Sequence, residues 1–268
     1  MSITTLAQAQ TTTTRVLPGV VGPDIRGGET DFTTTEGNGS GDENALGNFT
    51  NTVLTVYNAD IVASAGINPG DVLTGLSFRV GGGIPFNPAP NFTVDNYIID
   101  LGISVNSAGS LVDNFNANAV GGALTQVHSG SVDFNAADFP NVNPNTGTGI
   151  ANSFGPTIEF DTNFTYTGGD LLLRYTHTAP LSLNGAPVVT SRGDNIASTF
   201  VTPDFADSRV QTLFGSGFNN TERDFDAIFG ENFATIVQFD VVTSVPEPTS
   251  AVLLMGLGII GVARRRKM

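Results

Sequence analysis

Short runs of β-branched and aromatic residues, separated by Gly, Asn, Asp and Pro, fill the chain from Val16 to Val242. About ten such runs occur, and no segment has the periodicity of an amphipathic helix of about twelve residues. Parallel strands need long, usually helical, crossovers, so this pattern predicts antiparallel sheets. We therefore expect an all-β fold, an antiparallel β-sandwich of jelly-roll type, with one short hydrophobic helix at the C-terminus.

Two of these runs alternate most clearly, which predicts half-buried strands. In the first, Val72, Thr74, Leu76, Phe78 and Val80 share one face, and Leu73, Gly75, Ser77 and Arg79 share the other; in the second, Ile99, Leu101, Ile103 and Val105 oppose Ile98, Asp100, Gly102 and Ser104. The other expected strands are Thr52–Tyr57, Leu124–Phe134, Asp170–Thr178, Val188–Thr190, Ile196–Val201, Arg209–Phe214 and Phe233–Val242. Loops at 37–47, 81–91, 135–155 and 203–208 are expected at the ends of the sandwich, where binding sites usually form.

The last 23 residues have three parts with different physical roles. Pro246, Glu247 and Pro248 come first and hold the backbone extended. An uncharged apolar stretch follows: Ala251, Val252, Leu253, Leu254, Met255, Gly256, Leu257, Gly258, Ile259, Ile260, Gly261, Val262 and Ala263. The basic tail consists of Arg264, Arg265, Arg266 and Lys267. A helix from Thr249 to Ala263 would be roughly 22 Å long, shorter than the roughly 30 Å hydrocarbon layer. Clustered positive charge stays cytoplasmic, so the preceding residues are expected outside the inner membrane.

These parts, in this order at the extreme C-terminus, resemble the PEP-CTERM sorting signal of Gram-negative bacteria that make exopolysaccharide. The resemblance implies a membrane-embedded exosortase as processing partner, the inner membrane as a transient anchor, and the cell surface or extracellular space as destination. The alternatives are an ordinary tail anchor or a buried core helix, although a core helix would not end in four basic residues. Residues 65–76 and 160–172 resemble, more loosely, the β-rich bodies of PEP-CTERM proteins. That likeness supplies no catalytic residues.

The N-terminus departs from the pattern of an exported protein. Ala7-Gln8-Ala9 has the form of a signal-peptidase site, but the six residues before it are too few and too polar to be the apolar run that should precede such a site. We expect the true start to lie upstream and the mature chain to begin near Gln10. Residues 1–15, including Thr11–Thr14, then form a flexible leader, residues 16–242 the sandwich domain and residues 243–268 the sorting segment.

The formal net charge of −14 hides an asymmetry, because four of the eleven positive charges lie in the tail at 264–267. The rest of the chain has seven Arg against 25 acidic residues, which is 7 − 25 = −18. Phosphate backbones repel such a surface, so no nucleic-acid partner is expected. The chain has no Cys, which excludes disulfides, thiolate metal sites and a Cys nucleophile.

Neither histidine carries a catalytic motif. His128 and His177 lie in expected strands, with no G-x-S-x-G or H-E-x-x-H pattern in the chain, and alternation places His177 beside Leu171, Leu173 and Tyr175. We therefore expect structural histidines and assign no catalytic residue.

Acidic loops are the remaining candidates for a site. Asn, Asp and Gly loops provide the oxygen ligands that Ca²⁺ binds, and the cluster Asp224, Asp226 and Glu231 is the weak candidate for a metal; the alternative is solvated surface charge. No other cofactor is expected.

The sequence thus favours a non-enzymatic structural or adhesive protein of the cell surface or of a biofilm matrix associated with exopolysaccharide. One alternative is a polysaccharide-binding module that depends on Ca²⁺, which the lack of Trp and the presence of only four Tyr weaken. The other is a secreted hydrolase with two carboxylates across a cleft.

Overall fold

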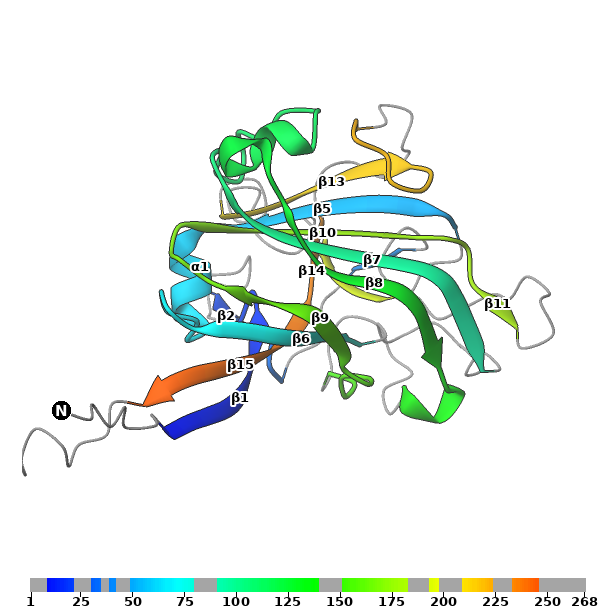
Figure 1. Cartoon of the computed structure of the whole chain (residues 1–268), viewed down its shortest axis with the longest axis horizontal. Helices are drawn as coiled ribbons and strands as arrows, with labels where there is room; N and C mark the ends of the chain where they lie inside the picture. Colours follow the sequence, from blue (N-terminus) through cyan, green and yellow to red (C-terminus); the bar gives the residue numbers. More distant parts are fainter. Residues whose placement is uncertain are drawn as a thin grey trace, which may run out of the picture.

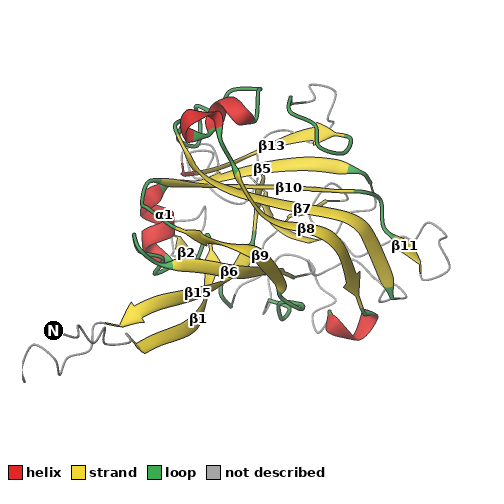
Figure 2. Cartoon of the chain, viewed as in Figure 1, coloured by secondary structure: helices red, strands yellow, loops and turns green. Residues whose placement is uncertain are grey.

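A computed structural model describes residues 9–21, 30–34, 39–41, 49–79, 91–139, 151–182, 193–197, 209–223 and 233–245. Strands make up most of this part, and the few helices are short turns beside the strand layers (Figure 2). The strands are β1 (Ala9–Leu17), β2 (Val20–Val21), β3 (Thr30–Asp31), β4 (Gly39–Gly41), β5 (Asn51–Tyr57), β6 (Val72–Phe78), β7 (Phe92–Ser104), β8 (Thr125–Phe134), β9 (Ile158–Thr165), β10 (Asp170–His177), β11 (Leu181–Ser182), β12 (Gly193–Ala197), β13 (Val210–Ser216), β14 (Phe233–Thr235) and β15 (Val237–Val245). The helices are α1 (Ala59–Ser64), η1 (Asn116–Asn118), η2 (Val120–Gly122) and η3 (Ala136–Asp138).

Two antiparallel sheets face each other (Figure 1). We call them the lower sheet, with strand order β1-β15-β6-β9, and the upper sheet, with order β8-β7-β10-β5-β13. The short strand β11 also belongs to the upper sheet and pairs with the start of β7, on the same side as β10. Every neighbouring pair in both sheets is antiparallel. The predicted all-β, antiparallel two-sheet architecture is confirmed, whereas the jelly-roll connectivity stays a prediction.

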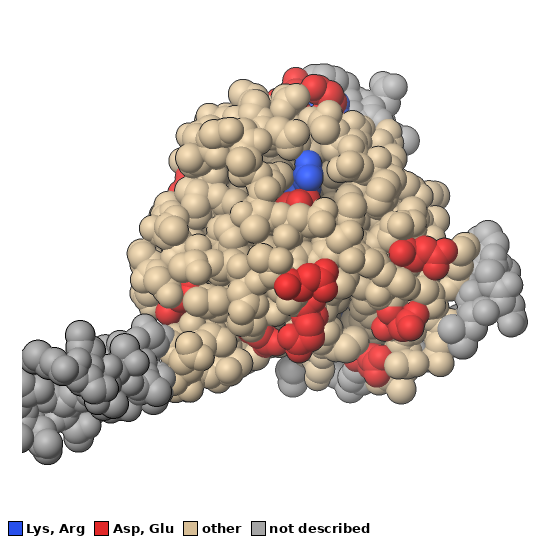
Figure 3. Space-filling model, viewed as in Figure 1, with Lys and Arg blue, Asp and Glu red and all other residues tan. Residues whose placement is uncertain are grey.

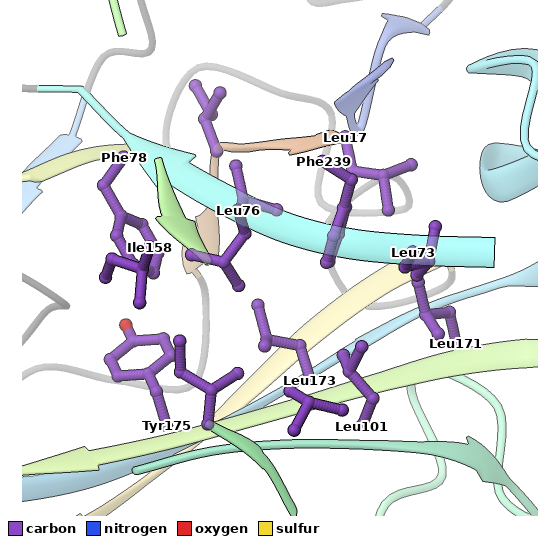
Figure 4. Close-up of a cluster of buried hydrophobic side chains, with 14 of the residues drawn as sticks. Leu17, Leu73, Leu76, Phe78, Leu101, Ile158, Leu171, Leu173, Tyr175 and Phe239 are labelled. Atoms are coloured by element: carbon purple, nitrogen blue, oxygen red, sulfur yellow. The ribbon is translucent and has the colours of Figure 1, made fainter. Parts of the chain in front are cut away.

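The core lies between these sheets (Figure 4). Leu73, Leu76, Phe78 and Phe239 point from the lower sheet toward Leu101, Leu171, Leu173 and Tyr175 of the upper sheet, and all eight are buried. The predicted split of β6 into two faces is wrong at Val72 and Thr74, which are only half-buried, while Leu73 joins Leu76 in the core. The pairing register shifts between Leu73 and Gly75, and such an irregularity moves the phase of side-chain alternation by one residue.

The upper sheet is buried on its outer face as well. Ile99 and Leu101 face the main core as predicted, but Asp100 on the opposite face is also buried. Residues 105–124, which include η1 and η2, fold over this face and pack Phe115 and Ala119 onto a second apolar cluster with Leu54, Val56, Leu172 and Leu213. The expectation of a half-buried strand is therefore wrong for β7, because a connecting segment covers the side expected to meet solvent.

Six strands were absent from the sequence prediction. These are β1, β9 and the short strands β2, β3, β4 and β11. The run Val188–Thr190, which was predicted as a strand, lies outside the described residues. None of the helices in the described ranges has the length and apolar character needed to cross a lipid bilayer. The predicted C-terminal helix lies outside these ranges, as do most residues of the four predicted long loops.

Candidate functional site

The sorting segment is attached to the end of a β-strand. Strand β15 ends at Val245, immediately before Pro246, and pairs with β1 along its whole length, from Leu17↔Val237 to Ala9↔Val245. These two strands form a ribbon that projects away from the rest of the domain (Figure 1). We call this pair the terminal ribbon. The residues after Val245, including the Pro-Glu-Pro motif, the apolar stretch and the basic tail, lie outside the described residues.

The composition of β1 explains why it forms a strand. Gln10 is followed by four threonines, whose β-branched side chains favour the extended backbone, and these pair with Asp240–Thr243 of β15. At the end of the strand nearest the domain, Val16 and Leu17 are buried in the main core. Arg15 adds a further link, because its Nε donates to the carbonyl oxygen of Gly66 at 3.2 Å.

This arrangement changes the expected limits of the domain. Thr11–Thr14 were expected in a flexible leader, but they lie in β1, and β15 extends past the expected boundary at residue 242. Strand β6 pairs with β15 only as far as Val242, so β1 is the only strand beside Thr243, Ser244 and Val245 in the described part of the chain. Strand β1 is therefore the strand that pairs with the end of β15, where the sorting segment begins.

A buried polar cluster lies on the outer face of the upper sheet, beneath residues 105–124. Arg174 on β10 donates from Nε and Nη2 to Oδ2 of Asp100 on β7, at 3.0 and 2.9 Å. Its Nη1 donates to Oδ1 of Asn116 in η1 at 3.1 Å. Asp100 and Arg174 are only 4% and 9% exposed. Burial raises the pKa of the Asp100 carboxyl above its ordinary value of 3.8, and this effect outweighs the opposite effect of Arg174.

This cluster fastens the covering segment to the sheet. The cluster was not predicted from the sequence, although an Asp and an Arg inside two otherwise apolar runs were a visible signal. Their contact depends on β7 and β10 pairing with Arg174 opposite Asp100, which no local pattern shows.

The two histidines lie in structural positions. His177 is 1% exposed, stacks on the Tyr97 ring with centroids 5.4 Å apart, and has Nδ1 3.0 Å from the carbonyl oxygen of Thr178. It thus lies at the core, as alternation predicted. His128 has Nδ1 3.1 Å from the carbonyl oxygen of Glu159, which links β8 to β9.

Several acidic residues of the described ranges have hydrogen-bond partners close by. Thr93 Oγ1 donates to Asp133 at 2.6 Å, the Asn135 amide donates to Asp138 at 2.9 Å, and Asn114 Nδ2 donates to Glu222 at 2.8 Å. Within these ranges, no group of three or more His, Cys, Asp or Glu is placed to hold a metal ion. Figure 3 shows a face on which Asp and Glu form separate small groups amid uncharged surface. The metal candidates Asp224, Asp226 and Glu231 lie outside the described residues.

In the sequence, the two-sheet β-domain is followed directly by a Pro-Glu-Pro motif, an apolar stretch and a basic tail. Comparison with protein families matches residues 244–267 to the PEP-CTERM protein-sorting motif. The chain therefore carries a PEP-CTERM sorting motif at residues 244–267, and this motif implies export and sorting through an exosortase. No curated protein matches the chain.

Proposed function

We propose that this protein is a structural or adhesive component of the cell surface or extracellular matrix, displayed there by exosortase-dependent sorting. The observation that carries the proposal is the continuity between the sorting motif and the fold. The matched motif begins at Ser244, inside β15, so the sorting segment starts within an internal strand of the lower sheet. The whole β-domain is then the cargo.

We also propose that the domain is not an enzyme. The histidines support this, because His177 is enclosed against Tyr97 and His128 joins two strands. The polar cluster around Arg174 supports it too, since its groups bond one another beneath a covering segment. Buried side chains that satisfy one another stabilise structure and are poorly placed to meet a substrate.

In the proposed route the C-terminal helix is a transient anchor. The apolar stretch is short for a stable span, and the basic tail keeps its end in the cytoplasm. Removal of the segment would leave the terminal ribbon as the new C-terminal end of the protein.

Fractionation of cells with mass-spectrometric mapping of both termini tests the proposal. We expect native protein at the surface or in the medium, with a C-terminus near Val245 and an N-terminus near Gln10. A variant lacking Pro246–Met268 should lose surface attachment or processing, whereas Thr162→Lys, an exposed change on β9, should be sorted normally. Unchanged localisation of the truncated protein would refute the sorting role of the segment.

A pull-down with purified exopolysaccharide, with and without a Ca²⁺ chelator, separates the proposal from the binding-module alternative. Specific binding that the chelator abolishes would replace the structural role by Ca²⁺-dependent recognition of polysaccharide. Turnover of the polysaccharide by the purified protein would refute the non-enzymatic assignment.

A further inference from the structure

The edge strands of the two main sheets differ in how they are covered. Strands β8 and β9, at one edge of each sheet, pack beside each other, and the Ser129 amide of β8 donates to Asp161 Oδ2 of β9 at 2.9 Å. Strand β13, at the other edge of the upper sheet, packs against β14. The segment after β13 also lies close to this strand. A Cβ added at Gly215 of β13 would be only 2.7 Å from the carbonyl oxygen of Glu222. In the portion of the chain described, only β1 and the two-residue strand β11 among the edge strands of these two sheets pair with one strand and pack against no second one, and β1 is the long one of the two.

Strand β1 also lacks the features that usually keep an edge strand from pairing. Alternate N–H and C=O groups of a strand point away from its neighbour, so β1 has a row of backbone hydrogen-bonding groups that no strand of the described ranges pairs with. From Ala9 to Leu17 it contains no Pro, no Lys and no interruption in its register with β15. Its one charged residue, Arg15, is held at the domain end by hydrogen bonds to the carbonyl oxygens of Gly66 and Thr14.

The rest of the strand is an uncharged segment suited to pairing. Gln10–Thr14 contains four β-branched residues, and all five side chains are exposed except that of Thr13, which is half-buried. The terminal ribbon projects from the domain, so a further strand has room to approach along its free edge (Figure 1).

We propose that β1 is a self-association surface, on which β1 of a second copy of this chain pairs antiparallel over Gln10–Thr14. A two-fold axis at Thr12 places each residue of this segment opposite another from the same segment, with Gln10 opposite Thr14 and Thr11 opposite Thr13. The lower sheets of two molecules then become one continuous sheet.

The chemistry of the segment favours a second copy as the occupant. Threonines directly opposite one another stabilise paired strands, and the symmetric register supplies three such positions. Arg15 falls opposite Ala9, outside the paired segment, so no like charges face each other.

The net charge of the domain makes the association depend on salt. The domain is strongly acidic, and the long-range repulsion between two copies opposes association until salt screens it. Dimerisation should therefore strengthen as salt concentration rises.

This inference deepens the proposed structural role by naming the partner, but its test is separate. A protein that is sorted correctly yet stays monomeric would refute the self-association and leave the sorting role intact.

Sedimentation equilibrium of the full-length chain in detergent micelles measures the association. We expect dimers whose affinity falls at least about tenfold in Thr12→Lys, because a charge on an edge strand opposes pairing. Thr162→Lys is the matched control, since it makes the same substitution at an exposed Thr on the covered edge strand β9 and should leave the affinity unchanged. A chain that is monomeric at every concentration, or a dimer that Thr12→Lys leaves intact, would overturn the proposal; the latter result would indicate association through the apolar segment.

Cysteine crosslinking keeps the proposal testable even if Thr12→Lys impairs folding. The chain has no cysteine, so Thr12→Cys introduces a single thiol at the proposed two-fold axis. We expect oxidation, or a short bis-maleimide, to join two copies of Thr12→Cys and to leave Thr162→Cys monomeric. Equal crosslinking of the two variants, or none of Thr12→Cys, would contradict the proposed pairing.

Discussion

The buried pair of Asp100 and Arg174 leads to the sharpest prediction about stability. Two hydrogen bonds join Arg174 to Asp100, and only the bond to Asn116 would remain to the guanidinium if Asp100 became Leu. Because Arg174 is only 9% exposed, Asp100→Leu leaves a nearly buried charge and should cost about 3–5 kcal/mol. At about 2–4 °C per kcal/mol for a domain of this size, the melting temperature should fall by roughly 6–20 °C.

The double variant Asp100→Leu, Arg174→Met should behave differently. The pair is surrounded by Leu54, Leu172 and other members of the second apolar cluster, so two apolar side chains fit the site. Replacing both partners removes the cost of burying two charges, and the free energy of unfolding should be close to wild type or higher. The raised pKa of Asp100 agrees, since burial there outweighs the attraction of Arg174.

The raised pKa of Asp100 also determines how its contribution to the free energy of unfolding changes with pH. The folded protein holds the Asp100 proton more tightly than the unfolded chain does. This group therefore stabilises most below its ordinary pKa, and that contribution is lost as the pH rises through the folded pKa. Arg174→Met should move the folded pKa further upward, because Arg174 lowers it.

Urea unfolding of the four proteins of this cycle, between pH 4 and pH 7, measures both effects. The exposed pair of Arg209 and Asp60 is the control, and Asp60→Ala should cost less than about 1 kcal/mol. The reasoning fails if Asp100→Leu costs no more than that control, or if the double variant loses as much stability as the two single variants together.

Three further predictions concern the core and the terminal ribbon. Tyr57→Phe removes a hydrogen bond of 2.6 Å to the Thr235 carbonyl oxygen and should cost about 1–2 kcal/mol by thermal denaturation; an unchanged melting temperature would show that the bond is dispensable. Gly75→Ala places a Cβ about 2.5 Å from Cγ2 of Thr157, so it should destabilise by about 1–3 kcal/mol and be partly rescued by Thr157→Ser; no rescue would place the strain elsewhere. In hydrogen exchange, the alternate amides of Thr11–Thr14 that bond β15 should be protected, and uniformly fast exchange would instead support the flexible leader.

Local alternation was sufficient to predict most strands of both sheets. The runs at β5, β8, β10 and β13 begin and end close to the predicted residues, because a strand that packs against another layer needs apolar residues at alternate positions. Strand β7 ends close to the predicted residue but begins at Phe92, six residues before the predicted run. Alternation failed where an irregularity intervened, as at Leu73 and Gly75 in β6. Alternation also failed for the outer face of β7. Residues 105–124, which cover this face, have no repeating pattern that would show where they pack.

The candidate site was also predicted only in part from the sequence. The sorting motif was predicted from the sequence, because its Pro-Glu-Pro, apolar stretch and basic tail are recognised by composition and order, and comparison with protein families matches residues 244–267 to it. The pairing of Arg174 with Asp100 was not predicted, since it depends on the register between two strands. The hydrogen bond between Thr93 and Asp133 was likewise not predicted, since it joins two strands and residues 40 positions apart.

The sequence by itself determined the C-terminal sorting motif and the β-rich character of the domain, because both are encoded in contiguous residues. Only the tertiary structure decided that Thr11–Thr14 form a strand, that this strand pairs with the end of β15, and that no other described strand lies along its outer edge. Thr11 and Thr243 meet across 232 positions of the chain. Such a pairing is stabilised by the whole folded sheet, so neither segment alone shows that the other will be its partner.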